Sequence, residues 1–190
     1  FRLIAEHVRV MLDVPVALVT LVGSDRQFFA ASPGLPEPWA SEGGTPLDLS
    51  FCRHVVEDGR PVIVPDAHRD PDFRDHGAVE ALGVVAYLGV PLVNDDGHVL
   101  GSLCAIDSVP RQWTARDQEI LEDLAKLVEE QITLRERVAE MARFDAQRAL
   151  IQGELAHRIK NIFSVISSLL IVSSRTETDL EGFVQSVTGR

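Results

Sequence analysis

Cysteine, tyrosine and long hydrophobic runs are scarce in this sequence of 190 residues. The two cysteines, Cys52 and Cys104, are too few for the disulfide framework of a small secreted domain, and we expect both to be reduced thiols in a cytoplasmic protein. The longest apolar stretches, such as residues 14–22, are far shorter than the roughly 20 residues that cross a bilayer. No basic segment followed by an apolar one opens the chain, so the sequence predicts neither a membrane span nor a secretion signal.

Positive charge is also in the minority, with 18 lysines and arginines against 29 aspartates and glutamates and a formal net charge of -11. A surface of this charge repels phosphate backbones, so we expect no nucleic-acid partner. Apolar residues make up 45% of the chain, which is enough for a real core. The first residue is Phe1 rather than methionine, which favours an excised piece of a longer protein.

The first half of the chain has the pattern of a sheet, because short β-branched runs alternate with turn residues. Strands are expected at Val16–Val22 and at residues 27–31, 61–64, 86–93 and 99–107, and helices at residues 1–12, 50–58 and 71–82. Asn94-Asp95-Asp96-Gly97 predicts a hairpin turn between the last two strands. The fold class is therefore α+β.

Residues 32–45, which include Trp39, are rich in proline, glycine and glutamate. They predict a flexible loop that either covers a pocket or has no function.

A long helix is expected after Trp113, with Thr114 as its N-cap and Asp117 three residues later as an acidic version of the capping box. Apolar residues then alternate spacings of four and three, which is typical of the heptad stripe of a coiled coil. The stripe consists of Ile120, Leu124, Leu127, Gln131, Leu134, Val138 and Met141. It predicts a partner helix and therefore a homodimer.

The stripe continues beyond Met141, but the step to Phe144 repeats a spacing of three. Such a slip overwinds a coiled coil locally, and a rotation or bending signal could be absorbed there. A helix break at residues 144–148 is the alternative. Polar residues 173–179 predict a turn, and residues 180–187 predict the start of a second helix.

Residues 153–169 form the most informative segment. At about 100° per residue, Leu155, Ile159, Ile162 and Ile166 face one direction on a helix, and His157 lies off that stripe. The nearby side chains of Arg158, Lys160 and Asn161 place cations and an amide beside an accessible imidazole.

Phosphoryl transfer to a histidine needs a neutral imidazole of fixed tautomer. Glu154 lies three residues before His157 on the helix and is expected to orient the ring or accept its proton, while positive side chains stabilise the transferring phosphoryl group. The alternative is an ordinary amphipathic helix whose surface histidine lies among charges.

The order Glu-Leu-x-His-Arg-x-Lys-Asn at residues 154–161 resembles the phosphoacceptor signature of the HWE and HisKA_2 families of histidine kinases. The resemblance implies a dimerisation and phosphotransfer helix that is autophosphorylated on His157 and passes the phosphoryl group to a response-regulator aspartate. ATP would bind to a downstream domain, because no glycine-rich nucleotide-binding segment is evident in this chain, which should be inactive alone. Residues 189–190, Gly-Arg, resemble the start of the second-helix motif.

Several segments of the first half together resemble a GAF domain that covers about residues 1–135. They are residues 46–56, 64–67, 70–73, 87–92 and 101–107. The resemblance implies a central antiparallel sheet with flanking helices, a small-molecule pocket and dimerisation through terminal helices. We therefore expect a sensor domain at residues 1–135 and an incomplete dimerisation and phosphotransfer region at residues 136–190.

Cofactor ligands are weakly indicated. Cys52 and His54 stand two apart on an expected helix, but the Cys-His pair near which phytochrome-type GAF domains attach bilin is interrupted here by Arg53. Zinc would need two further ligands, and only Cys104 and Asp107 suggest themselves, so buried structural cysteines and no metal site are favoured.

The sequence allows two interpretations for each of two other groups of residues. The aspartates Asp66, Asp70 and Asp72 suit a divalent cation or, preferably, ordinary turns. Phe73 and Tyr87 are either pocket or core aromatics.

The sequence thus predicts the sensory and phosphoacceptor portion of a two-component histidine kinase, in which a small ligand biases helix geometry around His157. One alternative is a ligand-binding and dimerisation module without phosphotransfer. Another is a free-standing methionine sulfoxide reductase that uses Cys52 or Cys104.

Overall fold

The computed structural model of the chain describes residues 1–176 and 184–185. The chain divides into two compact units, residues 1–136 and residues 137–190. Helix α5 (Ala115–Thr176) contributes to both units, which are described separately.

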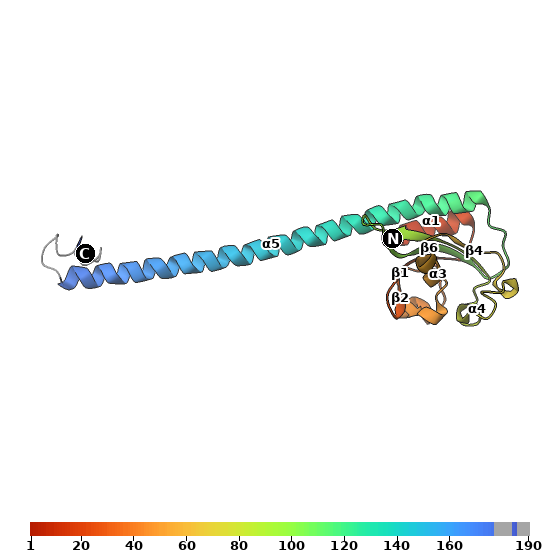
Figure 1. Cartoon of the computed structure of the whole chain (residues 1–190), viewed down its shortest axis with the longest axis horizontal. Helices are drawn as coiled ribbons and strands as arrows, with labels where there is room; N and C mark the ends of the chain where they lie inside the picture. Colours follow the sequence, from red (N-terminus) through yellow and green to blue (C-terminus); the bar gives the residue numbers. More distant parts are fainter. Residues whose placement is uncertain (177–183, 186–190) are drawn as a thin grey trace. The chain divides into compact units, whose positions relative to one another are not determined.

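The first unit is built on one sheet in which every pair of neighbouring strands is antiparallel. The strand order is β3-β2-β1-β6-β5-β4 (Figure 1). The strands are β1 (Val16–Val22), β2 (Arg26–Ala31), β3 (Gly44–Pro46), β4 (Val62–Val64), β5 (Ala86–Val93) and β6 (Val99–Asp107). The predicted α+β class with a central antiparallel sheet is confirmed.

Helices cover both faces of this sheet. Besides α5 they are α1 (Arg2–Leu12), α2 (Trp39–Glu42), α3 (Cys52–Asp58) and α4 (Gly77–Leu82), with the 3-10 helices η1 (Leu47–Leu49) and η2 (Ala67–Arg69). Helix α1 and the start of α5 lie on one face, and α3 and α4 lie on the other (Figure 1). Each face therefore has its own core.

The two cores follow from the alternation of side chains along the strands. Ala17 and Val19 of β1 pack toward α1 and α5, whereas Val16 and Leu18 pack toward α3. In α5 the residues that reach the sheet are Leu121, Ala125 and Val128, all buried. These three residues form what we call the docking face of α5.

The hairpin and the helix cap have the geometry that the sequence predicts. In the β5–β6 turn the amides of Gly97 and His98 donate to Asn94, and Gly97 has the positive φ of 83° that the turn requires. Thr114 and Asp117 cap α5 reciprocally, at 2.8 Å from the Thr114 amide to Asp117 and 3.2 Å from the Asp117 amide to Thr114.

The link between the sheet and α5 is held by Arg111. Its guanidinium donates to the carbonyl oxygens of Leu12 and Asp13 at the end of α1, and lies 3.5 Å from Asp107 at the end of β6. It also lies over the ring of Trp113, whose indole NH donates to the Val64 carbonyl at 3.2 Å. These contacts fix where α5 leaves the sheet.

Two predictions for the first unit need correction. The expected loop at residues 32–45 contains α2 and ends in the edge strand β3, because Gln27 donates from β2 to Thr45 at 2.7 Å. The helix expected at residues 71–82 begins only at Gly77, because the Asp72 amide bonds to Asp70 in a turn and His76 caps the helix through the Ala78 amide.

Helix α5 also differs from expectation in two places. It is continuous through residues 144–148, so the predicted alternative of a break there is wrong. It also continues through residues 173–176, where a turn was expected, while the rest of that turn and most of the expected second helix lie outside the described residues. Among the helices that the structure describes, we find none that combines the length and apolar character of a bilayer span.

Candidate functional site

His157 lies on the exposed surface of α5. Its ring Nδ1 is 3.4 Å from the side-chain Nδ2 of Asn161, one helical turn later. Lys160 is exposed beside it. The structure thus brings the histidine together with an amide and a cation on one helix surface.

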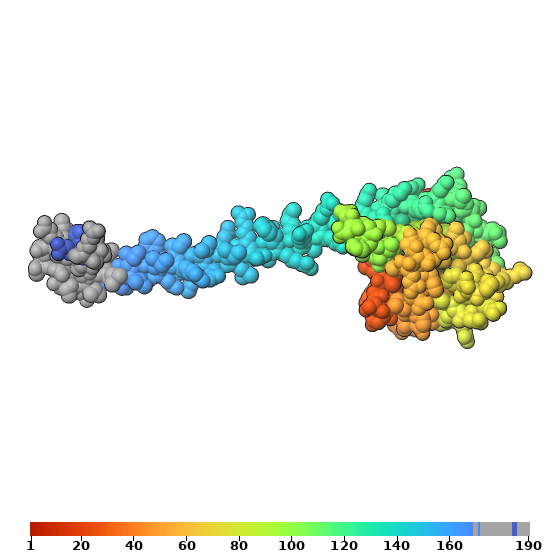
Figure 2. Space-filling view, in the orientation of Figure 1, coloured from red at the N-terminus to blue at the C-terminus, as the bar shows by residue number. Residues whose placement is uncertain are grey.

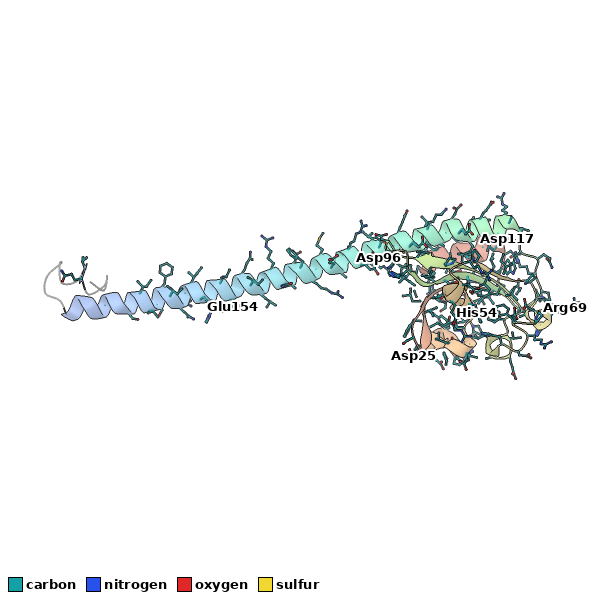
Figure 3. All side chains as sticks on the ribbon, in the orientation of Figure 1. Asp25, His54, Arg69, Asp96, Asp117 and Glu154 are labelled. Carbon is teal, nitrogen blue, oxygen red and sulfur yellow. The ribbon has the colours of Figure 1, made fainter. Side chains whose placement is uncertain are left out.

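Glu154 has a different partner from the one expected. It forms an ion pair and hydrogen bond with Arg158, and Figure 3 shows its side chain projecting from α5. Asn161, rather than Glu154, is therefore the residue that contacts the imidazole of His157 in this structure.

The apolar stripe of α5 is uncovered around His157. Every residue of α5 from 134 to 168 is exposed (Figure 2). The exposed apolar side chains include Leu134, Val138, Met141, Phe144, Ile151, Leu155, Ile159, Ile162 and Ile166.

In the first unit, a cavity of about 30 Å³ lies between the sheet and α3. Its walls are Val16, Leu18, Gln27, Phe29, Leu35, Leu49, Phe51, Cys52, Leu82, Val84, Tyr87 and Ile106. Leu35 comes from the loop before α2, and Leu82 comes from α4. The indole NH of Trp39, the first residue of α2, donates to the Ala81 carbonyl of α4 at 3.3 Å. This volume is about two to three times the minimum for one water molecule, so in this state the cavity holds only very small molecules.

A buried polar cluster stands in the wall of this cavity. The sulfur atoms of Cys52 and Cys104 are 3.8 Å apart, and the Tyr87 hydroxyl lies 3.4 Å from the Cys52 sulfur and 3.5 Å from the Ser102 hydroxyl. Gly89 makes room for the tyrosine, since a Cβ there would come within 2.2 Å of the Tyr87 hydroxyl. Both cysteines are buried, as the sequence predicts, and Tyr87 belongs both to the core and to the cavity wall.

The cluster shifts the pKa values of the two thiols in opposite directions. The hydrogen bond with Cys104 above all lowers the pKa of Cys52 to about 7, with help from the hydroxyls of Thr20, Tyr87 and Ser102 and against the effect of burial. Burial raises the pKa of Cys104 well above its usual value, and burial likewise raises the pKa of Tyr87. A negative charge in this cluster therefore resides on Cys52.

His54 does not share a site with Cys52. It lies on α3, labelled in Figure 3, where its ring packs edge-on against Phe73 at 5.2 Å and stands 5.6 Å from the ring of His76. Burial lowers the pKa of both histidines, and the charge of Arg53 lowers it further. Phe73 stacks on Phe51 at 4.8 Å but does not line the cavity.

The three aspartates of the β4–α4 connection act in turns. Asp66 accepts the His68 amide at 3.1 Å, and Asp70 accepts the Asp72 amide at 2.9 Å. Within residues 1–176 and 184–185, no three histidine, cysteine or acidic side chains are grouped so that they could hold a metal ion.

Sequence reasoning missed the hydroxyls of Thr20 and Ser102, which are fully buried. The signal was present, because alternation along β1 and β6 places Thr20 on the face of Leu18 and Ser102 on the face of Cys104. A polar residue at the centre of an otherwise apolar strand is the pattern that would have found them.

The described geometry agrees with the families that the sequence matches. Residues 1–132 match the GAF domain family, which spans more than half of the chain, so the chain belongs to that family. Residues 154–190 match the HWE histidine kinase family, and this segment contains His157. The chain is therefore a GAF sensor domain followed by a histidine kinase region, and both resemblances drawn from the sequence are confirmed.

Two longer relatives share part of this chain. It is 40% identical over 118 residues to a cyclic di-GMP phosphodiesterase of Pseudomonas aeruginosa, covering 61% of the chain and 19% of that protein. It is 32% identical over 106 residues to the diguanylate cyclase DgcP of Escherichia coli, covering 55% of the chain and 29% of that protein. The chain spans less than a third of either relative, so their activities are not transferred to it.

A solved structure supports the fold. The GAF domain of a phosphoenolpyruvate-protein phosphotransferase from Acinetobacter aligns with a TM-score of 0.60 over 73% of this chain and 83% of its own, at 18% identity. At that identity the likeness concerns the fold alone.

Proposed function

We propose that this chain is the sensory and phosphoacceptor portion of a two-component histidine kinase, autophosphorylated on His157 by a downstream ATP-binding domain and passing the phosphoryl group to a response-regulator aspartate. The observation that carries the proposal is an exposed histidine on α5 within the segment that matches the HWE histidine kinase family.

The surroundings of His157 suit a phosphoacceptor. The side-chain Nδ2 of Asn161 lies 3.4 Å from Nδ1 of His157. A 180° turn of that amide would let its oxygen accept from Nδ1–H and leave the lone pair of Nε2 as the nucleophile. Lys160 is exposed nearby, so its positive charge is available to the transferring phosphoryl group, whereas the charge of Arg158 is paired with Glu154. Asn161 thus takes the orienting role that the sequence suggested for Glu154.

Dimerisation through α5 is part of the proposal. The exposed stripe from Leu134 to Ile166 has steps of three, four or seven residues, with the slip at Phe144, and packing against another helix would bury its apolar residues. In the first unit, a groove of about 420 Å³ between α1 and α5, lined by Leu3, Leu124, Leu127 and Leu134 among others, extends the same seam. A second copy of the chain is the partner that we propose.

The cavity beneath α3 is the proposed sensor site for a small molecule. At about 30 Å³ it is far smaller than the roughly 300 Å³ of an ordinary ligand pocket. A ligand would have to displace Leu35, Leu49 or Leu82, which close it, and would thereby favour an opened state over this one.

The test uses the chain extended by its own downstream sequence, incubated with γ-labelled ATP. The native protein should acquire acid-labile phosphate, and His157→Ala should lose it to background. His98→Ala is the matched control, because His98 is also an exposed histidine and does not line the groove between α1 and α5, and it should keep the native labelling.

Two results would contradict the proposal. Equal labelling of the native protein and His157→Ala would place the phosphate elsewhere, and absence of label from a folded, ATP-binding protein would favour a ligand-binding and dimerisation module. Turnover of methionine sulfoxide by the chain would favour the reductase.

A further inference from the structure

The two cysteines are placed for bond formation with each other. Their sulfur atoms are 3.8 Å apart, and a disulfide has a sulfur–sulfur bond of about 2.05 Å, so closure needs an approach of about 1.8 Å. Cys52 is the first residue of α3, and Cys104 lies within the central strand β6, between β1 and β5. Closure therefore requires the two sulfur atoms to move toward each other across the contact between α3 and β6.

Burial decides which molecules reach the pair. Cys52 is 2% exposed and Cys104 is fully buried, so a thiol of another protein has no access to either sulfur. Cys52 nevertheless lines the cavity of about 30 Å³, which accommodates a water molecule or a reagent of similar size. A peroxide meets that limit, whereas an amino acid or a nucleotide does not fit this state of the cavity.

The polar cluster favours reaction at Cys52. Hydrogen bonds from Cys104 and Tyr87 reach its sulfur, and its pKa of about 7 leaves a large thiolate fraction at neutral pH. Cys104 keeps its proton under the same conditions, because burial raises its pKa. The Cys52 sulfur is thus the one that attacks an oxidant, and the Cys104 sulfur is the one that then attacks oxidised Cys52.

We propose that Cys52 and Cys104 form an oxidation site of the sensor domain, in which a small peroxide entering the cavity converts the two thiols into a disulfide. The Cys52 sulfur attacks one peroxide oxygen, the S–O bond forms and the O–O bond breaks. The sulfur is oxidised by two electrons to a sulfenic acid, and the leaving hydroxide takes the proton that the thiol has lost and departs as water.

The second step closes the bridge. The Cys104 sulfur attacks the Cys52 sulfenic sulfur, the S–S bond forms, the S–O bond breaks, and the Cys104 proton leaves with the hydroxide as a second water. A dithiol reductant reverses the change once the chain is unfolded. The bridge ties the start of α3 to the central strand at the wall of the sensor cavity, so oxidation state and ligand binding act on the same place.

The test exposes the chain to hydrogen peroxide under native conditions and measures intact mass and thiols after unfolding. The expected result is loss of both thiols, a mass decrease of two hydrogens, one peptide pair linked between residues 52 and 104, and full recovery with dithiothreitol. The same treatment with free methionine sulfoxide should leave both thiols intact. A disulfide formed equally fast with the sulfoxide would overturn the choice of peroxide.

Three variants assign the roles. Cys104→Ser keeps a hydrogen-bond donor and should accumulate a sulfenic acid that dimedone traps after the oxidised chain is unfolded, whereas Cys52→Ser should form none. Tyr87→Phe keeps the ring but removes the hydroxyl, so oxidation by hydrogen peroxide should slow by roughly tenfold and the pH midpoint of that oxidation should rise.

Either of two results on the native chain overturns the proposal, whether or not the variants fold. One is survival of both thiols at a peroxide dose that oxidises the urea-unfolded chain. The other is a disulfide that links two copies of the chain instead of residues 52 and 104.

Discussion

Replacing Leu121 with alanine tests the docking of α5 on the sheet. Leu121 is fully buried in the core shared with α1, whereas Leu127, six residues further along the same helix, is 47% exposed. A buried Leu→Ala change costs about 3 kcal/mol, because the apolar contacts are lost and a cavity remains. The higher helix propensity of alanine stabilises α5 by only a few tenths of a kcal/mol, which does not offset this loss.

The expected shift in melting temperature follows from the size of the first unit. With an unfolding entropy of about 2.1 cal/mol/K per residue, a unit of 136 residues loses about 10 °C for a loss of 3 kcal/mol. Leu127→Ala is the matched control on the same helix. It should change the stability of the first unit by less than about 0.5 kcal/mol, since its side chain is half exposed.

Urea unfolding followed by tryptophan fluorescence suits this comparison, because Trp113 packs against the same core as Leu121. Each variant is measured at several protein concentrations. The cost of Leu121→Ala should not depend on concentration, whereas any cost of Leu127→Ala should appear only where the proposed dimer forms. Equal free energies of unfolding for the two variants would refute docking of α5 through Leu121.

Three further predictions concern the sheet, the dimer and pH. Gly101→Ala should cost at least about 3 kcal/mol in urea unfolding, because its Cβ would lie 1.9 Å from the Thr20 carbonyl oxygen, and native stability would contradict this. Leu134→Asn should raise the dissociation constant of the dimer in sedimentation equilibrium without lowering the stability of the first unit, and an unchanged dimer would remove Leu134 from the seam. The pKa of His54 and His76 is lower in the folded than in the unfolded chain, so the unfolded chain binds more protons as pH falls below about 6.5, and stability falls with it. Melting temperatures across that range should drop for the native chain and drop less for the double His→Gln variant.

The sheet of this protein could be read from the sequence because its signals are local. The run of residues 16–22 alternates between two apolar cores, and the Asn-Asp-Asp-Gly turn contains its own hydrogen-bond acceptors in Asn94. The cap formed by Thr114 and Asp117 likewise depends on residues three apart. Patterns between residues only a few positions apart can be recognised without knowledge of the fold.

Features that depend on distant partners could not be read in the same way. Strand β3 is held by the pairing of Gln27 with Thr45, and neither residue has a strong strand signal. The docking face of α5 is displaced by one residue from the heptad stripe, and both sets are apolar, so only the position of the sheet distinguishes Leu121 from Leu124. The approach of Cys52 to Cys104 spans 52 positions of the sequence and depends on the packing of α3 on β6.

The one-residue offset between the docking face and the stripe constrains the construction of chimeric sensors. At about 100° per residue, the two faces of α5 have a fixed angular relation that the sequence of residues 120–128 encodes. Deleting a single residue after Val128 would turn every later side chain by that angle, whereas deleting seven would nearly restore the phase. A foreign sensor spliced onto this output therefore has to preserve the heptad count of the junction, and a series of junctions differing by one residue should give outputs that repeat with a period of seven.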